Sequence, residues 1–280
     1  MKKLLLLLIT LSTLSFSQTN WIWQNPLPVG KSLNAGQAFD SLVCYAAGNA
    51  GAFLRTTDGG NNWQLVNTGT DHDILSISFK DRLNGVLGCG QGLIMKTTDG
   101  GNSFTKIMVD SVRDIKAVQF LPSGKVWAAG DKGLFLTSQD NGSSWARKSF
   151  DTVSIATIFF FESGKGFIAG ESGTIFRTLD GGNNWSKIRE DLNQTISSIS
   201  FSSELNGLAF GRNGLSLKTT DGGASWQQFN SGLFGWIKSF SQLPGNNLIA
   251  AGSPGLIFRS SDSGNSWRKT NDSSKFYFNF

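Results

Sequence analysis

The sequence predicts an all-β protein folded as a β-propeller, which is a ring of four-stranded antiparallel blades. A motif of the form Ser/Thr-x-Asp-x-Gly-x-x-aromatic occurs six times, and successive motif aspartates are 40 or 41 residues apart. Short apolar runs separated by turn residues fill each interval, and glycine (34 residues) greatly outnumbers proline (5 residues). A period of about 41 residues with four strands is typical of one propeller blade. We therefore expect six full blades.

Within one repeat, the first strand is an alternating run such as Ile74 to Phe79. The dipeptide Asn84-Gly85 is expected to turn the chain into the second strand. Paired glycines, such as Gly130 and Gly133, predict the next turn, where both residues could take a positive φ at little cost. The third strand covers Leu134 to Thr137 or its equivalents, and the fourth is expected to begin at the motif aromatic.

The repeated motif has a structural explanation. The aspartate can accept hydrogen bonds from the backbone of its own turn, the preceding Ser or Thr hydroxyl can do the same, and the aromatic can pack as a wedge. Six copies favour a structural role, because a catalytic group is needed once and a turn is needed in every blade. The motif residues are Asp58, Asp99, Asp140, Asp180, Asp221 and Asp262, with Trp63, Phe104, Trp145, Trp185, Trp226 and Trp267.

The N-terminus has the pattern of a secretory signal peptide. Lys2 and Lys3 precede an apolar run that ends near Ser17, so we expect residues 1–17 to be removed and residues 18–280 to form one secreted, periplasmic or cell-surface domain. No long apolar run follows, which argues against a membrane span. Without the two lysines, 23 basic residues face 20 acidic ones, and so small an excess argues against a nucleic-acid partner. Cys44 and Cys89 are expected to be unpaired, buried thiols.

The two ends of the chain resemble parts of one further blade. Residues 19–26 resemble a fourth, outermost strand, and residues 275–280 resemble a first, innermost strand. An open ring would expose unpaired strand edges and apolar faces. We therefore expect a seven-bladed parent whose last blade is incomplete in this chain.

The motif resembles the Asp-box, or bacterial neuraminidase repeat, of sialidases, sortilin-type receptors and some glucanases. The longer pattern Gly-x-x-Gly-x-Ile/Leu-Phe-Arg/Lys-Thr-x-Asp-Gly-Gly-Asn-Asn-Trp is most similar to the photosystem II stability and assembly factor-like propellers, and the resemblance runs from Trp21 to the C-terminus. It implies the propeller fold, and nothing in the sequence requires a cofactor. Photosynthetic members are lumenal assembly chaperones without enzymatic activity, although their photosystem partner does not carry over.

The alternative function is an extracellular glycoside hydrolase of the sialidase or glucanase type. A sialidase needs a tyrosine nucleophile, and the only tyrosines are Tyr45, in an expected interior strand, and Tyr277 near the C-terminus. A glucanase needs two positioned carboxylates, and no spacing selects a pair from the acidic loop residues. These residues are Asp73, Asp114, Asp131, Glu171 and Glu190. The lone His72 indicates neither a catalyst nor a metal site.

The main hypothesis is a non-catalytic, monomeric scaffold that binds a protein or a glycan. Loops that enter the first strands and the paired-glycine turns should emerge on one face of the ring, where polar and aromatic residues differ between blades. The candidate binding residues are His72, Asp73, Arg113, Asp114, Asp131, Lys132, Glu171, Arg212 and Trp236. Trp236 discriminates between hypotheses, because an exposed ring would favour recognition and a buried ring would be a plug.

Overall fold

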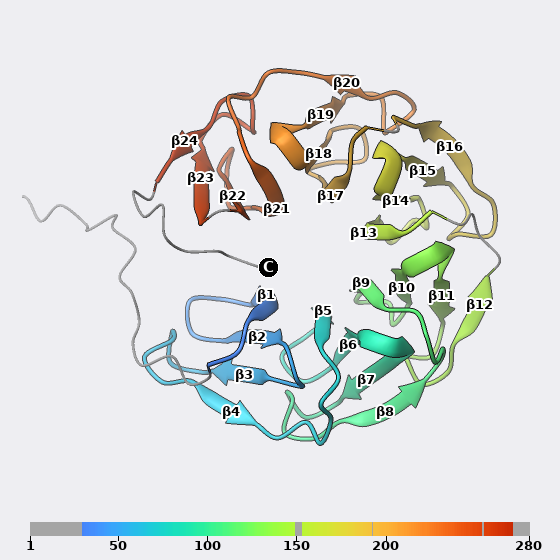
Figure 1. Cartoon of the computed structure of the whole chain (residues 1–280), viewed down its shortest axis with the longest axis vertical. Coiled ribbons are helices and arrows are strands. Elements are labelled where there is room, and N and C mark those ends of the chain that lie inside the picture. Colours follow the sequence, from blue (N-terminus) through green and yellow to red (C-terminus); the bar gives the residue numbers. More distant parts are fainter. Residues whose placement is uncertain (1–29, 149–152, 192, 254, 271–280) are drawn as a thin grey trace, which may run out of the picture.

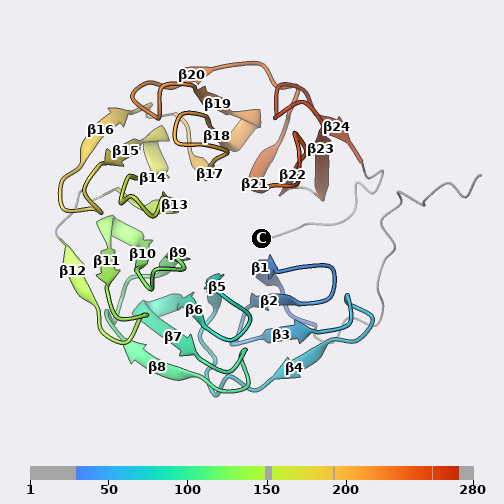
Figure 2. The same cartoon turned by 180° about the vertical axis from the view of Figure 1, so that it is seen from behind.

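Six four-stranded antiparallel sheets stand around a central opening in the computed structural model (Figure 1). The structure describes residues 30–148, 153–191, 193–253 and 255–270. The expected signal peptide at 1–17 and the strand-like segments at 19–26 and 275–280 lie outside these residues. Within each sheet the strands run in sequence order from the centre outwards, as the reverse view in Figure 2 also shows. The all-β propeller with six four-stranded blades is confirmed.

The innermost strands line the opening, and the outermost strands form the rim. The innermost strands are β1 (Leu33–Ala38), β5 (Ile74–Phe79), β9 (Ile115–Phe120), β13 (Ile155–Phe160), β17 (Ile196–Phe201) and β21 (Trp236–Gln242). The second strands are β2 (Cys44–Gly48), β6 (Gly85–Cys89), β10 (Val126–Gly130), β14 (Gly166–Gly170), β18 (Gly207–Gly211) and β22 (Leu248–Ser253). The third strands are β3 (Phe53–Thr56), β7 (Leu93–Thr97), β11 (Phe135–Ser138), β15 (Ile175–Thr178), β19 (Ser216–Thr219) and β23 (Leu256–Ser260). The fourth strands are β4 (Gln64–Val66), β8 (Thr105–Met108), β12 (Ala146–Lys148), β16 (Ser186–Arg189), β20 (Gln227–Gln228) and β24 (Arg268–Lys269).

Two faces of the ring follow from this order. One, here called the turn face, carries the loops that enter the innermost strands and the turns between second and third strands. In four blades that turn is a short 3₁₀ segment, namely η1 (Gly90–Gly92), η2 (Asp131–Gly133), η3 (Glu171–Gly173) and η4 (Arg212–Gly214). The other, here called the box face, carries the six Asp-boxes and the loops between first and second strands. Among the described residues, no helix is long and apolar enough to cross a bilayer.

The Asp-box turns form as expected. In the first box the Thr56 hydroxyl donates to Asp58 Oδ1 at 2.8 Å and accepts the Gly60 amide at 2.9 Å. Asp58 also accepts the backbone and side-chain N–H groups of Asn62. Comparable bonds lower the pKa of Asp180 to about 2, below the ordinary 3.8. A lowered carboxyl pKa stabilises the fold above pH 4, and this contribution is lost as the pH falls towards 2.

The box aromatics pack between blades rather than within one. Phe104 of the second blade meets Phe53 of the first edge-on, with ring centroids 5.1 Å apart. Larger rings also cross the blade junctions face to face, as where Trp127 in β10 stacks on Phe160 in β13 at 4.0 Å. Trp127 is 1% exposed. Burial of such rings supplies most of the attraction that holds neighbouring blades together.

Two predicted turns differ from the structure. Gly85 begins β6 without a positive φ, because the turn before it is organised by Asp81, which accepts the amides of Leu83 and Asn84. Gly130 is extended, with φ −174°, and only Gly133 takes a positive φ, of 67°. Fourth strands begin one residue after the box aromatic, and β11 begins one residue later than expected.

The joint between the sixth and first blades differs from the other five. Successive innermost strands pack closely from β1 to β21 in chain order, whereas β21 and β1 make no comparable contact in the part of the chain that the structure describes. The third blade buries Trp127 and Ala129 against its neighbour, but the corresponding Ile249 and Ala251 of the sixth blade are only half-buried. Six blades are therefore present, and among the described residues one junction, here called the looser joint, is less closely packed than the rest.

Both cysteines are unpaired, as expected. Cys89 is fully buried in β6, and burial raises the pKa of its thiol to about 12. Cys44, in β2 next to the looser joint, is only partly buried, so the prediction of two buried thiols is wrong for this residue. Cys44 is covered less because no described sixth-blade strand packs closely over this side of the first blade.

Candidate functional site

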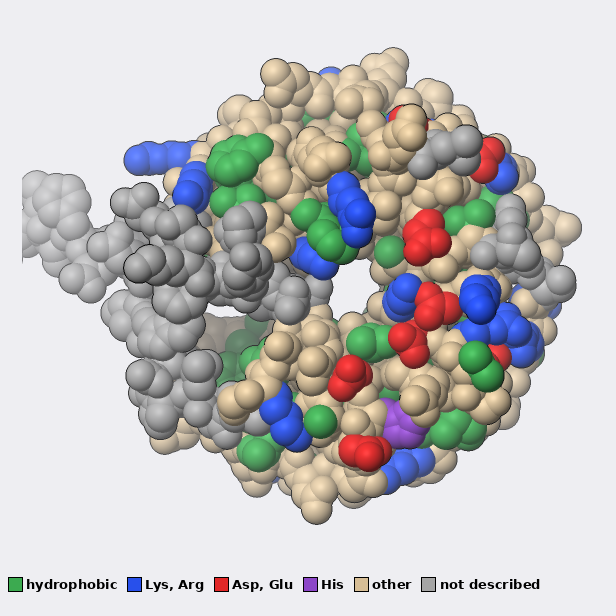
Figure 3. Space-filling model, in the orientation of Figure 1, with side chains coloured by type: hydrophobic (Ala, Val, Ile, Leu, Met, Phe, Trp, Pro, Cys, Tyr) green, Lys and Arg blue, Asp and Glu red, His purple; other side chains and the backbone are tan. Residues whose placement is uncertain are grey.

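All nine candidate binding residues lie on the turn face. They occupy the loops before β5 and β9, the segments η2, η3 and η4, and the start of β21. Figure 3 views this face, identified by the single histidine in purple. Acidic side chains follow the lower right rim of the opening there, and a group of basic and hydrophobic side chains lies above it. The structure thus brings the candidates to one face but does not gather them into one cluster.

Several candidates join adjacent blades. Asp73, before β5, accepts the backbone N–H of Ala50 in the preceding blade at 2.8 Å. Asp114, before β9, likewise accepts the N–H of Gln91 at 3.0 Å. Both amides belong to turn residues with positive φ. These carboxylates hold successive blades together, which gives them a structural function.

Other candidates are engaged in local pairs. Asp131 forms an ion pair with Lys116 of β9, with 2.5 Å between Oδ1 and Nζ. The Arg113 side chain lies 3.6 Å from Asp110 and donates to the Lys132 carbonyl at 3.4 Å. His72 Nδ1 lies 3.1 Å from the Gly90 carbonyl. Glu171 is exposed, and no side-chain partner is seen for it among the described residues.

A different arrangement surrounds Trp236, where β21 begins. The guanidinium carbon of Arg212 lies 4.2 Å from the centroid of the indole ring, and Lys238 Nζ lies 3.2 Å from it. The indole Nε1–H donates to Ser197 Oγ at 2.6 Å. Trp236 is half-buried, so it is neither the fully exposed anchor nor the buried plug considered from the sequence. Cations against an aromatic face are stabilised by its quadrupole.

No acidic partner of the two cations beside Trp236 is found among the described residues. In the described part of the chain neither Arg212 nor Lys238 forms an ion pair, although seven pairs form elsewhere. Burial, followed by the charge of Arg212, lowers the pKa of Lys238. Lys238 is half-buried and Arg212 is exposed. A half-buried cation beside a second positive charge is unfavourable, and a bound anion would offset both the burial and the repulsion.

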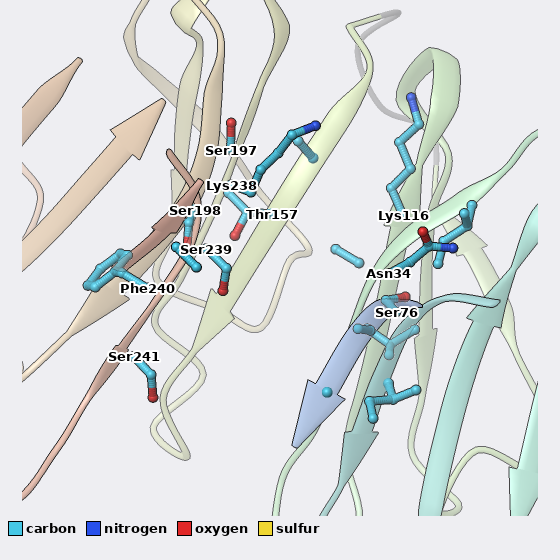
Figure 4. Close-up of a pocket in the computed structure, with 18 of the residues that line it drawn as sticks. Asn34, Ser76, Lys116, Thr157, Ser197, Ser198, Lys238, Ser239, Phe240 and Ser241 are labelled. Carbon is cyan, nitrogen blue, oxygen red and sulfur yellow. The ribbon is translucent and has the colours of Figure 1, made fainter. Parts of the chain in front are cut away.

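This cluster opens onto a cavity of about 380 Å³ at the central opening. Figure 4 shows Lys238, Ser197, Ser198, Thr157 and Ser239 on one side, facing Asn34, Ser76 and Lys116 on the other. The mouth is therefore lined by hydroxyl, amide and ammonium groups. Ile77, Val118 and Ile158, one or two residues further along the same strands than Ser76, Lys116 and Thr157, line the cavity with apolar side chains.

Sequence reasoning found Arg212 and Trp236 but missed Ser197 and Lys238. A signal was present, because Lys238 lies 24 residues before its box aspartate, as does Lys116 in the third blade. Aligning the repeats on the boxes would have placed both lysines at one position of the innermost strand. Lys116 forms an ion pair and Lys238 does not, because the residues around them come from different turns. Only the structure shows this difference.

The acidic residues considered for glycan hydrolysis are mostly occupied. Asp73 and Asp114 bind backbone amides, Asp131 pairs with Lys116, and Glu190 pairs with Lys187 at 3.4 Å. Every described carboxyl group whose pKa is shifted has it lowered, whereas a general acid requires a raised pKa. No group of three or more metal-ligating side chains forms within residues 30–148, 153–191, 193–253 and 255–270.

The chain matches a known protein family in sequence. The sequence pattern of the family described as Photosynthesis system II assembly factor YCF48 matches residues 57–152, 111–179 and 178–277. The chain belongs to this family. The YCF48 family pattern thus covers the second to sixth blades and the fourth strand of the first blade, whose first three strands lie before the match. No curated protein matches the chain in sequence.

Solved structures share the fold of this YCF48-family chain. "YCF48 bound to D1 peptide" is 19% identical with a TM-score of 0.69, covering 89% of this chain and 85% of that one. YCF48 from Cyanidioschyzon merolae is 17% identical with a TM-score of 0.69, covering 87% and 86%. An ancestral GH74 enzyme is 19% identical with a TM-score of 0.71, covering 89% of this chain and 40% of the enzyme. The same fold therefore occurs in binding proteins and in enzymes, and the site must decide between them.

Proposed function

We propose that this chain is a non-catalytic scaffold that binds a protein segment on its turn face, around the mouth of the central opening. The observation that carries the proposal is the half-buried Trp236, with two cations that form no ion pair among the described residues, beside a hydroxyl-lined cavity. Aromatic and arginine side chains at the edge of a cavity are typical of protein-binding hot spots. Membership of the YCF48 family supports the proposal, and one structural relative is recorded with a bound peptide.

Location and architecture belong to the same proposal. A leader at residues 1–17 would carry the chain out of the cytoplasm. Both cysteines are free thiols, so the propeller would need no disulfide bond to fold there. A seven-bladed parent would account for the half-buried Ile249 and Ala251, because a further blade would cover this side of the sixth. We expect the chain to act as a monomer.

Selection from a random-peptide library displayed on phage tests this function. Peptides selected on the full chain should bind the wild type and lose binding to Trp236→Ala. Leu205→Ala is the matched control, since it truncates a side chain that is 57% exposed on the box face. Selection of no peptide, or peptides that bind Trp236→Ala equally well, would contradict the proposal.

The hydrolase alternative requires a separate measurement. GH74 relatives share the fold, so the full chain should be incubated with xyloglucan, other β-glucans and sialosides, and the products analysed. We expect no turnover, because four of the five candidate acids are bound by backbone amides or lysines. Cleavage of any of these glycans would overturn the non-catalytic assignment.

A further inference from the structure

The two lysines at the cavity mouth occupy one repeat position but have different surroundings. This position lies 24 residues before each box aspartate and holds Asn34, Leu75, Lys116, Ala156, Ser197 and Lys238 in blades one to six. The third and sixth blades are separated by half the ring, so the lysines face each other across the opening (Figure 4). One of them is neutralised within its own blade and the other is not.

The turn residue nine positions before each box explains the difference. In the third blade it is Asp131, which pairs with Lys116. In the sixth blade the same position holds Ser253, and in the adjoining fifth blade it holds Arg212. Lys238 thus receives no carboxylate from its own turn and meets a second cation from its neighbour. Positive charge is concentrated there, and no described carboxylate forms an ion pair with either cation.

The contact between the fifth and sixth blades at this point also differs from the contacts made by the second and third blades. Twenty-six residues before the box, the second and third blades carry Asp73 and Asp114, whose carboxylates tether the preceding turn. The sixth blade carries Trp236 at that position, and its ring packs against Arg212 of the preceding turn. Where the second and third blades have an acidic tether, the sixth blade therefore has an aromatic surface flanked by cations, which is suited to an anion.

We propose that Arg212 and Lys238 form a carboxylate-binding subsite that anchors an acidic peptide at the mouth of the central opening. This inference rests on the proposed protein-binding function and specifies the chemistry of the partner. An arginine fork can bind a carboxylate through two parallel hydrogen bonds, and the lysine adds a point charge. The hydroxyls of Ser198 and Ser239, which line the cavity beside Lys238, can bind the peptide backbone.

The rest of the face favours a peptide over a polyanion. Asp73, Asp114, Asp131 and Glu171 lie on the same turn face, and Figure 3 shows acidic side chains along the rim of the opening. A nucleic acid or a sulfated glycan would meet this repulsion along its length. A peptide with one or two carboxylates can place them at the cation pair and keep its neutral parts near the acidic rim.

Titration with a defined peptide tests the subsite. The probe is a capped hexaglutamate, with a capped hexaglutamine of equal length and an oligogalacturonate as comparisons. The readout is the indole N–H resonance of Trp236 in the ¹⁵N-labelled full chain, assigned with Trp236→Phe. We expect hexaglutamate to shift this resonance to saturation, hexaglutamine to leave it unchanged, and Arg212→Gln and Lys238→Gln each to weaken hexaglutamate binding by about tenfold.

The opposite side of the opening supplies the matched control. In the double variant Lys116→Gln/Asp131→Asn a neutral pair replaces an ion pair at the same repeat position, so hexaglutamate affinity should stay within about twofold of wild type. Hexaglutamate binding that survives Lys238→Gln, equal binding of hexaglutamine, or tighter binding of oligogalacturonate would each overturn the carboxylate subsite. Thermal unfolding of each variant shows whether the fold is intact.

The library selection distinguishes this inference from the function on which it rests. Selected peptides that depend on Trp236 but lack acidic residues and tolerate Lys238→Gln would overturn the carboxylate subsite and leave protein binding standing. Failure to select any peptide on the turn face would remove both. Acidic peptides that lose affinity for Lys238→Gln would support both.

Discussion

The paired glycines of each turn are required for two different reasons. Gly133 takes a φ of 67°, a conformation that side chains with a Cβ rarely adopt. Gly130 is extended, but a Cβ there would lie 1.8 Å from the Asp114 carbonyl oxygen, because the turn passes close to the chain entering the innermost strand. The sequence identified both positions as glycine-dependent. It could not separate torsional freedom from close approach, since the second depends on a segment 16 residues away.

A second close approach, that of Gly85 to the Phe79 ring, can be tested by substitution with alanine. Gly85→Ala should destabilise the protein by about 1–3 kcal/mol, because the new Cβ would lie 2.4 Å from the Phe79 ring in a packed core. Gly36→Ala, on β1, is the control, since its nearest neighbour would be the Tyr45 carbonyl at 3.4 Å and its φ is not positive. Equilibrium denaturation by urea measures both. Equal destabilisation by the two variants would show that contact with the Phe79 ring does not explain the glycine at position 85.

Strands and turns were predictable to different degrees. The alternating runs gave the bounds of inner strands such as Ile74–Phe79 correctly, because each run begins and ends with a buried apolar residue. The Asn84-Gly85 turn was assigned wrongly because residue 85 must be glycine to leave room for the Phe79 ring and not to form the turn. Ring contacts of this kind join residues of different strands, so local sequence patterns do not contain them.

The basic residue three positions before most boxes also acts between elements. An exposed blade edge would leave these side chains in solvent. Instead Arg55 donates to the Gly100 carbonyl at 3.4 Å, and Lys96 donates to Ser143 at 2.6 Å, each acceptor lying in the box of the next blade. Lys218 is the equivalent in the fifth blade and lines a second cavity of about 370 Å³ beside the sixth box. The repeat position thus links blades at the first two junctions, whereas Arg259 of the sixth blade is exposed.

Equivalent positions in tight and loose junctions should contribute unequally to stability. Trp127 stacks on Phe160, is 1% exposed and donates its Nε1–H to the Gly181 carbonyl at 3.1 Å, so Trp127→Ala should cost about 3–5 kcal/mol. Ile249 holds the same position in the sixth blade but is only half-buried, and Ile249→Ala should cost about 1 kcal/mol. Urea denaturation of the two variants compares the junctions. A large loss for Ile249→Ala would mean that the sixth blade is packed as tightly as the others.

At the scale of the whole ring, symmetry fixes the scaffold and departures from symmetry form the site. Six boxes with a regular period were enough to predict the fold, because every blade repeats the same local solution. The candidate site depends on where the repeats differ, as at Arg212, Trp236 and Lys238. Two of these three were selected from the sequence as variable loop residues. The contacts among these residues depend on how neighbouring blades meet. These contacts, and the lack of a described acidic partner, could be found only in the structure.

Thiol labelling should report how the ring opens. Cys44 is partly exposed beside the looser joint, whereas Cys89 is 0% exposed and burial raises the pKa of its thiol to about 12. In the single-thiol variants Cys89→Ser and Cys44→Ser, an aromatic disulfide reagent should therefore label Cys44 at least about a hundredfold faster than Cys89 under native conditions. Cys89 labelling should accelerate only at denaturant concentrations that unfold the whole domain. If both thiols instead reacted at similar rates, the second blade would open without global unfolding, and the ring would not be one cooperative unit.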